Sequence, residues 1–183
     1  MDSQHHWNSI YKTKAPEQLS WTQEVPATSL NFVHSFDLPK TARIIDIGGG
    51  DSRLVDYLLE EGYTNVTVLD LSAEALWRAQ QRLGDKSKFA QWIVADVTAF
   101  QPAGEYDLWH DRAAFHFLTT EPQVTAYLTI ARGAVHPGGF NAANPASQRC
   151  SPAPTAAAII SSNAAFSFPA CCTTLATWSS VTL

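Results

Sequence analysis

Strand and helix signals alternate along the first 140 residues of this chain, and this alternation restricts the fold more than any other feature. Apolar runs rich in β-branched or aromatic residues occur at 43–47, 65–70, 89–95 and 106–110. Parallel strands joined through helices require right-handed crossovers and a sheet that is covered on both faces. The sequence therefore predicts a doubly wound α/β fold with a mostly parallel sheet.

Helical segments are expected before, between and after these strands. Apolar residues recur with helical spacing over 4–14, 26–36, 52–61 and 72–83. Thr120 opens a further helix, because the proline at position 122 suits a first helical turn. The sequence His136-Pro-Gly-Gly then predicts the turn that precedes a fifth strand.

The last 43 residues follow a different pattern. They contain all three Cys, eleven Ala and twelve Ser or Thr, and Arg149 is their single charged residue. A fifth strand after Phe140 should be apolar and β-branched, but the sequence there is Asn-Ala-Ala-Asn-Pro. We interpret 141–183 as a weakly ordered tail that is out of frame or replaced, with a native low-complexity extension as the alternative. The sheet would then be incomplete at its C-terminal strands.

Composition and charge exclude several classes of protein. A net charge of −5 and a pI near 5.6 give no basic surface for a phosphate backbone, so we expect no nucleic-acid partner. No apolar run approaches the roughly 20 residues that a bilayer requires, and the N-terminus lacks the features of a signal peptide. We therefore expect a cytoplasmic protein without a membrane partner. The histidines at 5–6 are adjacent, and the cysteines, two of them neighbours at 171–172 and one alone at 150, lack metal-ligand spacing, so no metal site is expected.

The predicted strand ends carry the residues that suggest chemistry. Three consecutive glycines, Gly48, Gly49 and Gly50, follow the first strand and allow the backbone to approach a ligand closely. Asp70 ends the second strand, where a carboxylate can accept hydrogen bonds from ribose hydroxyls. Asp96 follows the third. Arg53 occupies the position where a dinucleotide-binding fingerprint needs a small residue.

The series Asp46-x-Gly48-x-Gly50, Asp70, Asp96 resembles the class I, seven-stranded S-adenosylmethionine-dependent methyltransferases. Three further segments resemble a branch of small cytosolic enzymes that includes protein-lysine methyltransferases: Trp7-x-x-x-Tyr11, Ser20-Trp21 and 108–118. The resemblance covers residues 5–140 and implies a Rossmann-like fold that binds S-adenosylmethionine. It divides the chain into a helical cover over 1–40, a cofactor-binding domain over 41–140 and the tail over 141–183.

The resemblance also implies roles for individual residues. Gly48 would lie against the methionine part of the cofactor, and Asp70 would hold the ribose. Asp96 and Val97 would take the adenine, and Arg112 would lie at the cofactor-facing end of the fourth strand. The remaining residues expected at the cofactor are Trp7, Tyr11 and Trp21 of the cover, with Asp46, Gly49, Gly50 and Leu71.

Methyl transfer requires an aligned nucleophile, and an amine acceptor must arrive neutral. His110, Asp111 and His116 cluster at and after the fourth strand, so they are the candidate catalytic residues, although a histidine that is only hydrogen-bonded in the core would explain either ring. Trp109, Phe115 and Phe117 would wall the acceptor slot. The acceptor, a protein lysine or a small molecule, stays open. The alternatives are a nicotinamide-dependent oxidoreductase and a non-catalytic module that binds the cofactor.

Overall fold

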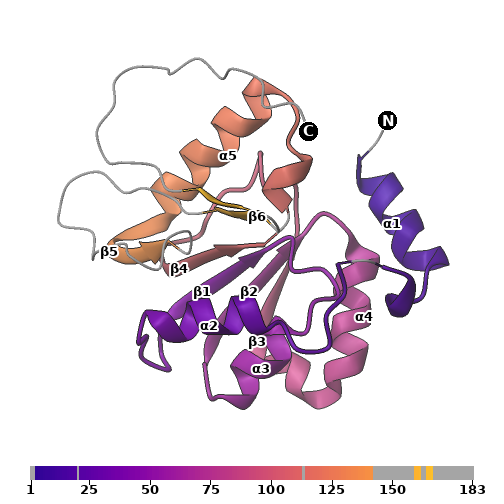
Figure 1. Ribbon diagram of the computed structural model, residues 1–183, viewed down its shortest axis with the longest axis horizontal. Helices are drawn as coiled ribbons and strands as arrows, with labels where there is room; N and C mark the ends of the chain where they lie inside the picture. Colours follow the sequence, from indigo (N-terminus) through magenta and orange to yellow (C-terminus); the bar gives the residue numbers. More distant parts are fainter. Residues whose placement is uncertain (1–2, 20, 113, 142–158, 162–163, 167–183) are drawn as a thin grey trace.

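The computed structural model describes residues 3–19, 21–112, 114–141, 159–161 and 164–166. A five-stranded sheet lies at the centre, with the strand order β3-β2-β1-β4-β5 and every neighbouring pair parallel (Figure 1). The strands are β1 (Arg43–Ile47), β2 (Asn65–Asp70), β3 (Ala90–Val94), β4 (Tyr106–Asp111) and β5 (Val135–Asn141). This order confirms the predicted doubly wound α/β fold.

Helices cover both faces of the sheet. They are α1 (Ser3–Thr13), α2 (Ala27–Ser35), α3 (Leu54–Glu60), α4 (Ala73–Leu83) and α5 (Glu121–Ala134), with short 3-10 turns η1 (Pro16–Gln18), η2 (Gly84–Phe89) and η3 (Ala114–Phe117). In Figure 1, α2, α3 and α4 lie on one side of the sheet and α5 lies on the other. The helices predicted from apolar spacing are all present, with ends shifted by a few residues.

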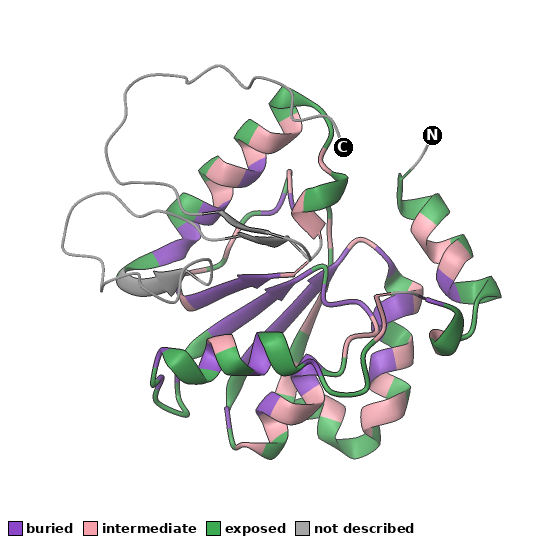
Figure 2. Ribbon diagram, viewed as in Figure 1, coloured by how far each residue is buried: buried purple, intermediate pink, exposed green. Residues whose placement is uncertain are grey.

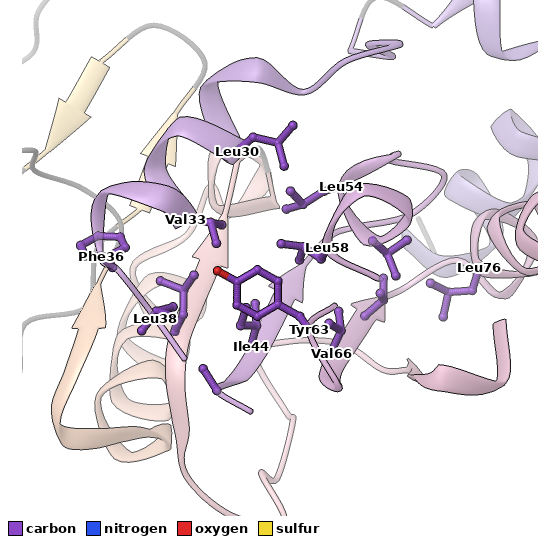
Figure 3. Close-up of a cluster of buried hydrophobic side chains, with 14 residues drawn as sticks. Leu30, Val33, Phe36, Leu38, Ile44, Leu54, Leu58, Tyr63, Val66 and Leu76 are labelled. Carbon is purple, nitrogen blue, oxygen red and sulfur yellow. The ribbon is translucent and has the colours of Figure 1, made fainter. Parts of the chain in front are cut away.

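Each face of the sheet has its own hydrophobic core. On one face Leu30 and Val33 of α2 and Leu54 and Leu58 of α3 pack against Ile44 of β1 (Figure 3). On the other face, Tyr127 and Ala131 of α5 belong to a second cluster with Ile45 and Ile47 of β1 and Trp109 of β4. The central strands are therefore buried on both sides, as Figure 2 shows. Each fully buried leucine contributes roughly 1.5–3 kcal/mol to the stability of this frame.

Strand order reverses between β1 and β4, which pair with each other while their crossovers lead to opposite edges of the sheet. Ile44 of β1 pairs with Val66 on one side and with Leu108 on the other. In open parallel sheets, ligands bind beyond the carboxyl ends of the strands at such a switch point. The fold therefore directs attention to the residues that follow β1 and β4.

The fifth strand begins earlier than the sequence pattern indicated. The residues expected to form the turn before it, His136-Pro137-Gly138-Gly139, lie inside β5 itself. The pairing with β4 is irregular there, since Tyr106 pairs with Val135 while Leu108 pairs with Phe140. Pro137 has no N–H for a ladder hydrogen bond, and an edge position with irregular pairing tolerates it. Among the described strands of the main sheet, β5 forms that edge.

Most of the predicted tail lies outside the described residues. Within it the structure describes two short strands, β6 (Ile159–Ser161) and β7 (Ala164–Phe166), which pair antiparallel in a separate sheet. The division into 1–40, 41–140 and 141–183 stays a prediction.

Candidate functional site

A cavity of about 490 Å³ extends along the carboxyl ends of four strands. From the β3 side to the β4 side, its lining includes Ala95, Asp96 and Val97, then Leu69, Asp70 and Leu71, then Ile47 and Gly48, then Arg112, Ala114, His116, Phe117 and Leu118. The N-terminal segments close it with Ser3, Trp7, Tyr11, Trp21, Gln23 and Thr28, and α5 adds Gln123. A volume of this size is typical of a small-molecule pocket.

The turn after β1 is shaped to let a ligand approach the backbone. Gly48 has φ +63° and Gly50 has φ +47°, values that residues with a side chain rarely adopt. The N–H of Gly48 donates to the carbonyl of Leu69 at 2.8 Å, which fixes the turn against β2. Gly48 lines the cavity. Gly50 does not, but a Cβ there would come within 2.9 Å of the Tyr11 hydroxyl and 3.0 Å of a carboxylate oxygen of Asp70.

We expect Gly48→Ala to weaken ligand binding and stability together. An added Cβ would lie 2.6 Å from the Cβ of Ala114, and the left-handed backbone would cost roughly a further 1–2 kcal/mol. Thermal unfolding and a titration with S-adenosylhomocysteine measure the two effects. Gly62→Ala is the matched control, because its φ is +88° but no atom lies within 4 Å of the added Cβ. Equal losses in the two variants would contradict the steric explanation.

Asp70 presents a buried carboxylate at the end of β2. Its exposed fraction is 8%, and its Oδ1 accepts the backbone N–H of Ser72 at 2.7 Å. Burial raises the pKa of Asp70 to about 6, and the nearby Asp46 charge adds to the rise. Backbone hydrogen bonds from Ser72, Gly50 and Leu71 oppose it. A carboxylate in this state gains from ligand hydroxyls that donate hydrogen bonds to it.

Asp46 and His110 form a buried pair beside the main cavity. The Asp46 Oδ1 lies 2.7 Å from His110 Nδ1, and His110 Nε2 lies 3.0 Å from the Ser29 hydroxyl of α2. All three residues are at most 3% exposed. Asp46 and His110 line a recess of about 40 Å³ that shares Gly48 with the main cavity. Both ring nitrogens of His110 therefore have partners within the protein.

The structure does not bring Asp111 to the cavity. Its carboxylate is fully buried, accepts the Tyr127 hydroxyl at 2.7 Å, and also accepts the backbone N–H groups of Ala114 and Phe115. Trp109 donates to the same Tyr127 oxygen at 2.9 Å. Burial raises the pKa of Asp111 to about 6. Asp111 thus anchors η3 to the core beneath the site.

The remaining aromatic and histidine candidates separate in the same way. Trp109 is fully buried, and Phe115 is partly buried against the same core cluster. His116 and Phe117, by contrast, line the cavity. Of the three predicted catalytic residues, His116 is the one whose side chain reaches the main cavity.

The N-terminal segments are hydrogen-bonded to the strand ends that they cover. The Asn8 Oδ1 of α1 accepts the Ser72 hydroxyl at 2.8 Å and the Glu74 N–H at 3.3 Å. Arg112 donates to the Trp21 carbonyl at 2.7 Å and to the Gln23 side chain. Burial, followed by the Asp70 charge, raises the pKa of Tyr11. Arg112 therefore lines the cavity while it holds the cover, a role that the sequence did not indicate.

The loop after β3 is also ordered by its own aspartate. Asp96 Oδ1 accepts the N–H of Thr98 at 2.8 Å and its hydroxyl at 2.7 Å, while Val97 is 7% exposed. Of the predicted cofactor residues, Asp46 and Gly49 line the small recess rather than the main cavity. Sequence reasoning missed Asn8, Gln23, Thr28 and Gln123.

The described segments contain neither a metal-binding cluster nor a helix suited to span a membrane. No group of three or more His, Cys, Asp or Glu side chains there is arranged to hold a metal ion. None of the helices that the structure describes has both the length and the apolar character of a membrane span.

Residues 44–139, more than half of the chain, match the family model described as a methyltransferase domain, and the chain belongs to that family. Its fold is that of solved S-adenosylmethionine-dependent methyltransferases, as the resemblance implied. A search of curated proteins found no match.

Solved structures agree with this assignment. The N-methyltransferase NodS from Bradyrhizobium japonicum WM9, in complex with S-adenosylhomocysteine, is 19% identical with a TM-score of 0.61, over 75% of this chain and 70% of that one. A methyltransferase from Mesorhizobium loti is 26% identical with a TM-score of 0.50, over 60% and 49%. The glycopeptide N-methyltransferase MtfA is 21% identical with a TM-score of 0.53, over 63% and 52%. This chain thus spans about half the length of the latter two.

The residues present fit S-adenosylmethionine. The cavity has the volume for a nucleoside with an amino-acid chain, the glycine turn leaves backbone exposed at its middle, and a buried carboxylate faces it from β2. The three carboxylates of the motif are divided between two spaces that share lining residues, with Asp70 and Asp96 on the main cavity and Asp46 on the recess.

Proposed function

We propose that this chain transfers a methyl group from S-adenosylmethionine to a nitrogen acceptor. The observation that carries the proposal is the cavity across the carboxyl ends of β3, β2, β1 and β4, with Asp70 buried at its wall and Gly48 at its middle. When bound, the cofactor supplies an activated methyl group on a sulfonium centre. The protein has to align the acceptor with that group and exclude water.

We propose the following roles for the cofactor side of the cavity. The Asp70 carboxylate accepts hydrogen bonds from both ribose hydroxyls, and Asp96 and Val97 contact the adenine. The backbone at Gly48 lies against the methionine part, next to the recess that Asp46 and His110 line. Trp7, Tyr11 and Trp21 exclude water from above. Leu71 and Arg112 complete the wall.

The acceptor side begins after β4. His116 is exposed at the cavity, and its ring lies 5.8 Å from that of Phe117. We propose that His116 takes the proton from an amine that bears one, since a neutral imidazole accepts protons near neutral pH. His110 is a positioning residue in this scheme, because its ring is already bonded to Asp46 and Ser29. We expect Asp111 to act through η3, which it anchors.

Two measurements test the proposed activity. Calorimetric titration with S-adenosylhomocysteine and with NAD separates a methyltransferase from the oxidoreductase alternative. The alternating strands and helices and the glycine turn also fit that alternative. Labelled methyl transfer into lysate proteins and metabolites separates an enzyme from a binding module and shows whether the acceptor is a protein lysine or a small molecule. Binding of NAD rather than S-adenosylhomocysteine would overturn the proposal.

We expect His116→Gln to lower kcat by about tenfold when the acceptor is a primary or secondary amine, while the Kd for S-adenosylhomocysteine stays within about twofold. Removal of a general base usually costs more, but water can replace an exposed imidazole in part. His34→Gln, on the distant outer end of α2, is the control. An unchanged kcat would remove His116 from the mechanism.

A further inference from the structure

We propose that the acceptor is an alkylamine that already carries N-methyl groups, and that three aromatic rings receive its nitrogen. This inference rests on the proposed function and specifies its substrate class. The rings belong to Trp7, Trp21 and Phe117, which we call the aromatic corner. They come from three different segments, α1, the connection between η1 and α2, and η3, and all three line the main cavity.

The rings of the aromatic corner meet nearly at right angles. The centroids of Trp7 and Trp21 are 5.9 Å apart with an interplanar angle of 75°, and those of Trp7 and Phe117 are 4.8 Å apart with an angle of 79°. In each perpendicular pair the edge of one ring meets the face of the other, and the remaining π faces are turned in different directions. Such faces attract an alkylated ammonium group through the ring quadrupole.

Phe117 keeps the aromatic corner open to solvent. Half of this large apolar side chain, 50%, is exposed, although Trp7 packs against it. An exposed phenylalanine at a cavity rim lacks the favourable free energy that burial of its ring in the core would provide. A bound apolar group would cover the ring and supply part of that free energy. An N-methyl group is apolar and of a suitable size for that contact.

The polar residues of the cavity argue against a primary ammonium at this end. Among the lining residues that the structure describes, the carboxylates are Asp70 and Asp96, both at the β2 and β3 ends. The other polar lining residues include the neutral side chains Gln23, Thr28 and Gln123, and also Arg112, whose guanidinium donates to the Trp21 carbonyl and to Gln23. A primary ammonium has three N–H donors and gains most from anionic acceptors, whereas each methyl group replaces one donor with apolar surface.

An amine that already carries N-methyl groups can accept a further methyl group. The lone pair of a tertiary amine forms the new N–C bond as the S–C bond breaks, and the electron pair of that bond returns to sulfur. No proton leaves, and the positive charge moves from sulfur to nitrogen. For a secondary amine, the N–H proton passes to His116. In both cases the rings of the aromatic corner face the nitrogen on which charge develops, so they stabilise the later part of the reaction.

A pair of isosteric probes tests the inference. Choline carries a trimethylammonium group, and 3,3-dimethylbutan-1-ol has the same shape without charge. With the protein saturated with S-adenosylhomocysteine, we expect choline to bind at least about fivefold more tightly than the alcohol, as cation–π contacts of this type provide. We expect Phe117→Leu to remove most of that preference. Phe89→Leu, an aromatic residue exposed at 60% outside the cavity lining, should keep it.

Three outcomes would overturn the inference while leaving the proposed function intact. These are equal affinities for choline and the alcohol, no measurable binding of choline, or a preference that persists in Phe117→Leu. Thermal unfolding of Phe117→Leu verifies that the variant is folded. The proposed function fails separately, if S-adenosylhomocysteine itself does not bind. A rate comparison adds an independent measurement, since N,N-dimethylethanolamine should be methylated faster than ethanolamine.

Discussion

Asp70→Asn is expected to raise the Kd for S-adenosylhomocysteine by about 100-fold at pH 8 without a loss of fold. The variant keeps the shape of the side chain but removes the negative charge that strengthens the hydrogen bonds donated by the two ribose hydroxyls of the ligand. Each hydrogen bond to a charged group is worth roughly 1.5–3 kcal/mol. Calorimetric titration measures the affinity. Glu60→Gln, on an exposed side chain of α3, is the control and should leave the Kd unchanged.

The same carboxylate predicts how affinity depends on pH. Burial raises the pKa of Asp70 to about 6 in the free protein, and hydroxyl donors of a ligand would lower it again, because they stabilise the charged form. Affinity should therefore be constant well above pH 6 and weaken below it, by up to about tenfold per pH unit. Asp70→Asn should flatten that slope. A slope that persists in the variant would assign the pH dependence to another group.

Asp111→Ala is expected to destabilise the protein by about 3–5 kcal/mol, because the Tyr127 hydroxyl and two backbone N–H groups lose their buried acceptor. For a chain of this size, the midpoint of thermal unfolding should fall by roughly 10 °C. Glu105→Ala removes an exposed carboxylate and is the matched control. A change of less than about 1 kcal/mol would contradict the anchoring role, since that is the range of surface substitutions.

The stability difference between wild type and Asp111→Ala should also depend on pH, because it includes the protonation of Asp111 in the wild type. The pKa of Asp111 is raised from 3.8 in an unfolded chain to about 6 in the folded protein. The folded state therefore binds the proton more tightly, and this contribution to stability is present below pH 4 and is lost as the pH rises through 6. The difference in unfolding free energy between wild type and variant should consequently be larger at pH 5 than at pH 8.

The strand ends could be predicted because one geometric rule brings them together. In a parallel sheet the residues that follow each strand meet at one edge, so Gly48, Asp70 and Asp96 could be located without knowledge of their contacts. The strands and helices could also be predicted from the periodicity of apolar residues, because both faces of the sheet have to be buried.

The roles of His110 and Asp111 could not be obtained in that way. Their partners are Ser29, 81 residues away on α2, and Tyr127, 16 residues away on α5. No local pattern specifies which side chain of a helix packs over a given strand position. The sequence therefore predicted three candidate catalytic residues in one cluster. In the structure, tertiary packing buries two of them, His110 and Asp111.

The fifth strand shows a different limit of sequence reasoning. Pro137 and the glycines beside it are turn formers by local preference, and they predict a break before the strand. In the structure, the edge position of β5 lets the same residues remain in the strand with irregular pairing to β4. Local preference was overridden because an edge strand needs fewer ladder hydrogen bonds than a central one.

Ser72 has a consequence that extends beyond its role as a helix cap. Its backbone N–H bonds to Asp70, its hydroxyl oxygen accepts the N–H of Ala75, and the same hydroxyl donates to Asn8 of α1. One residue thus ties the N-terminal helix to the Asp70 carboxylate, and both line the same cavity. If a ligand binds Asp70 more tightly when the helix is docked, it favours the docked position, and by thermodynamic reciprocity the docked helix raises the affinity for the ligand by the same factor. Ser72 therefore links the position of the N-terminal helix to the carboxylate that we expect to hold the ligand.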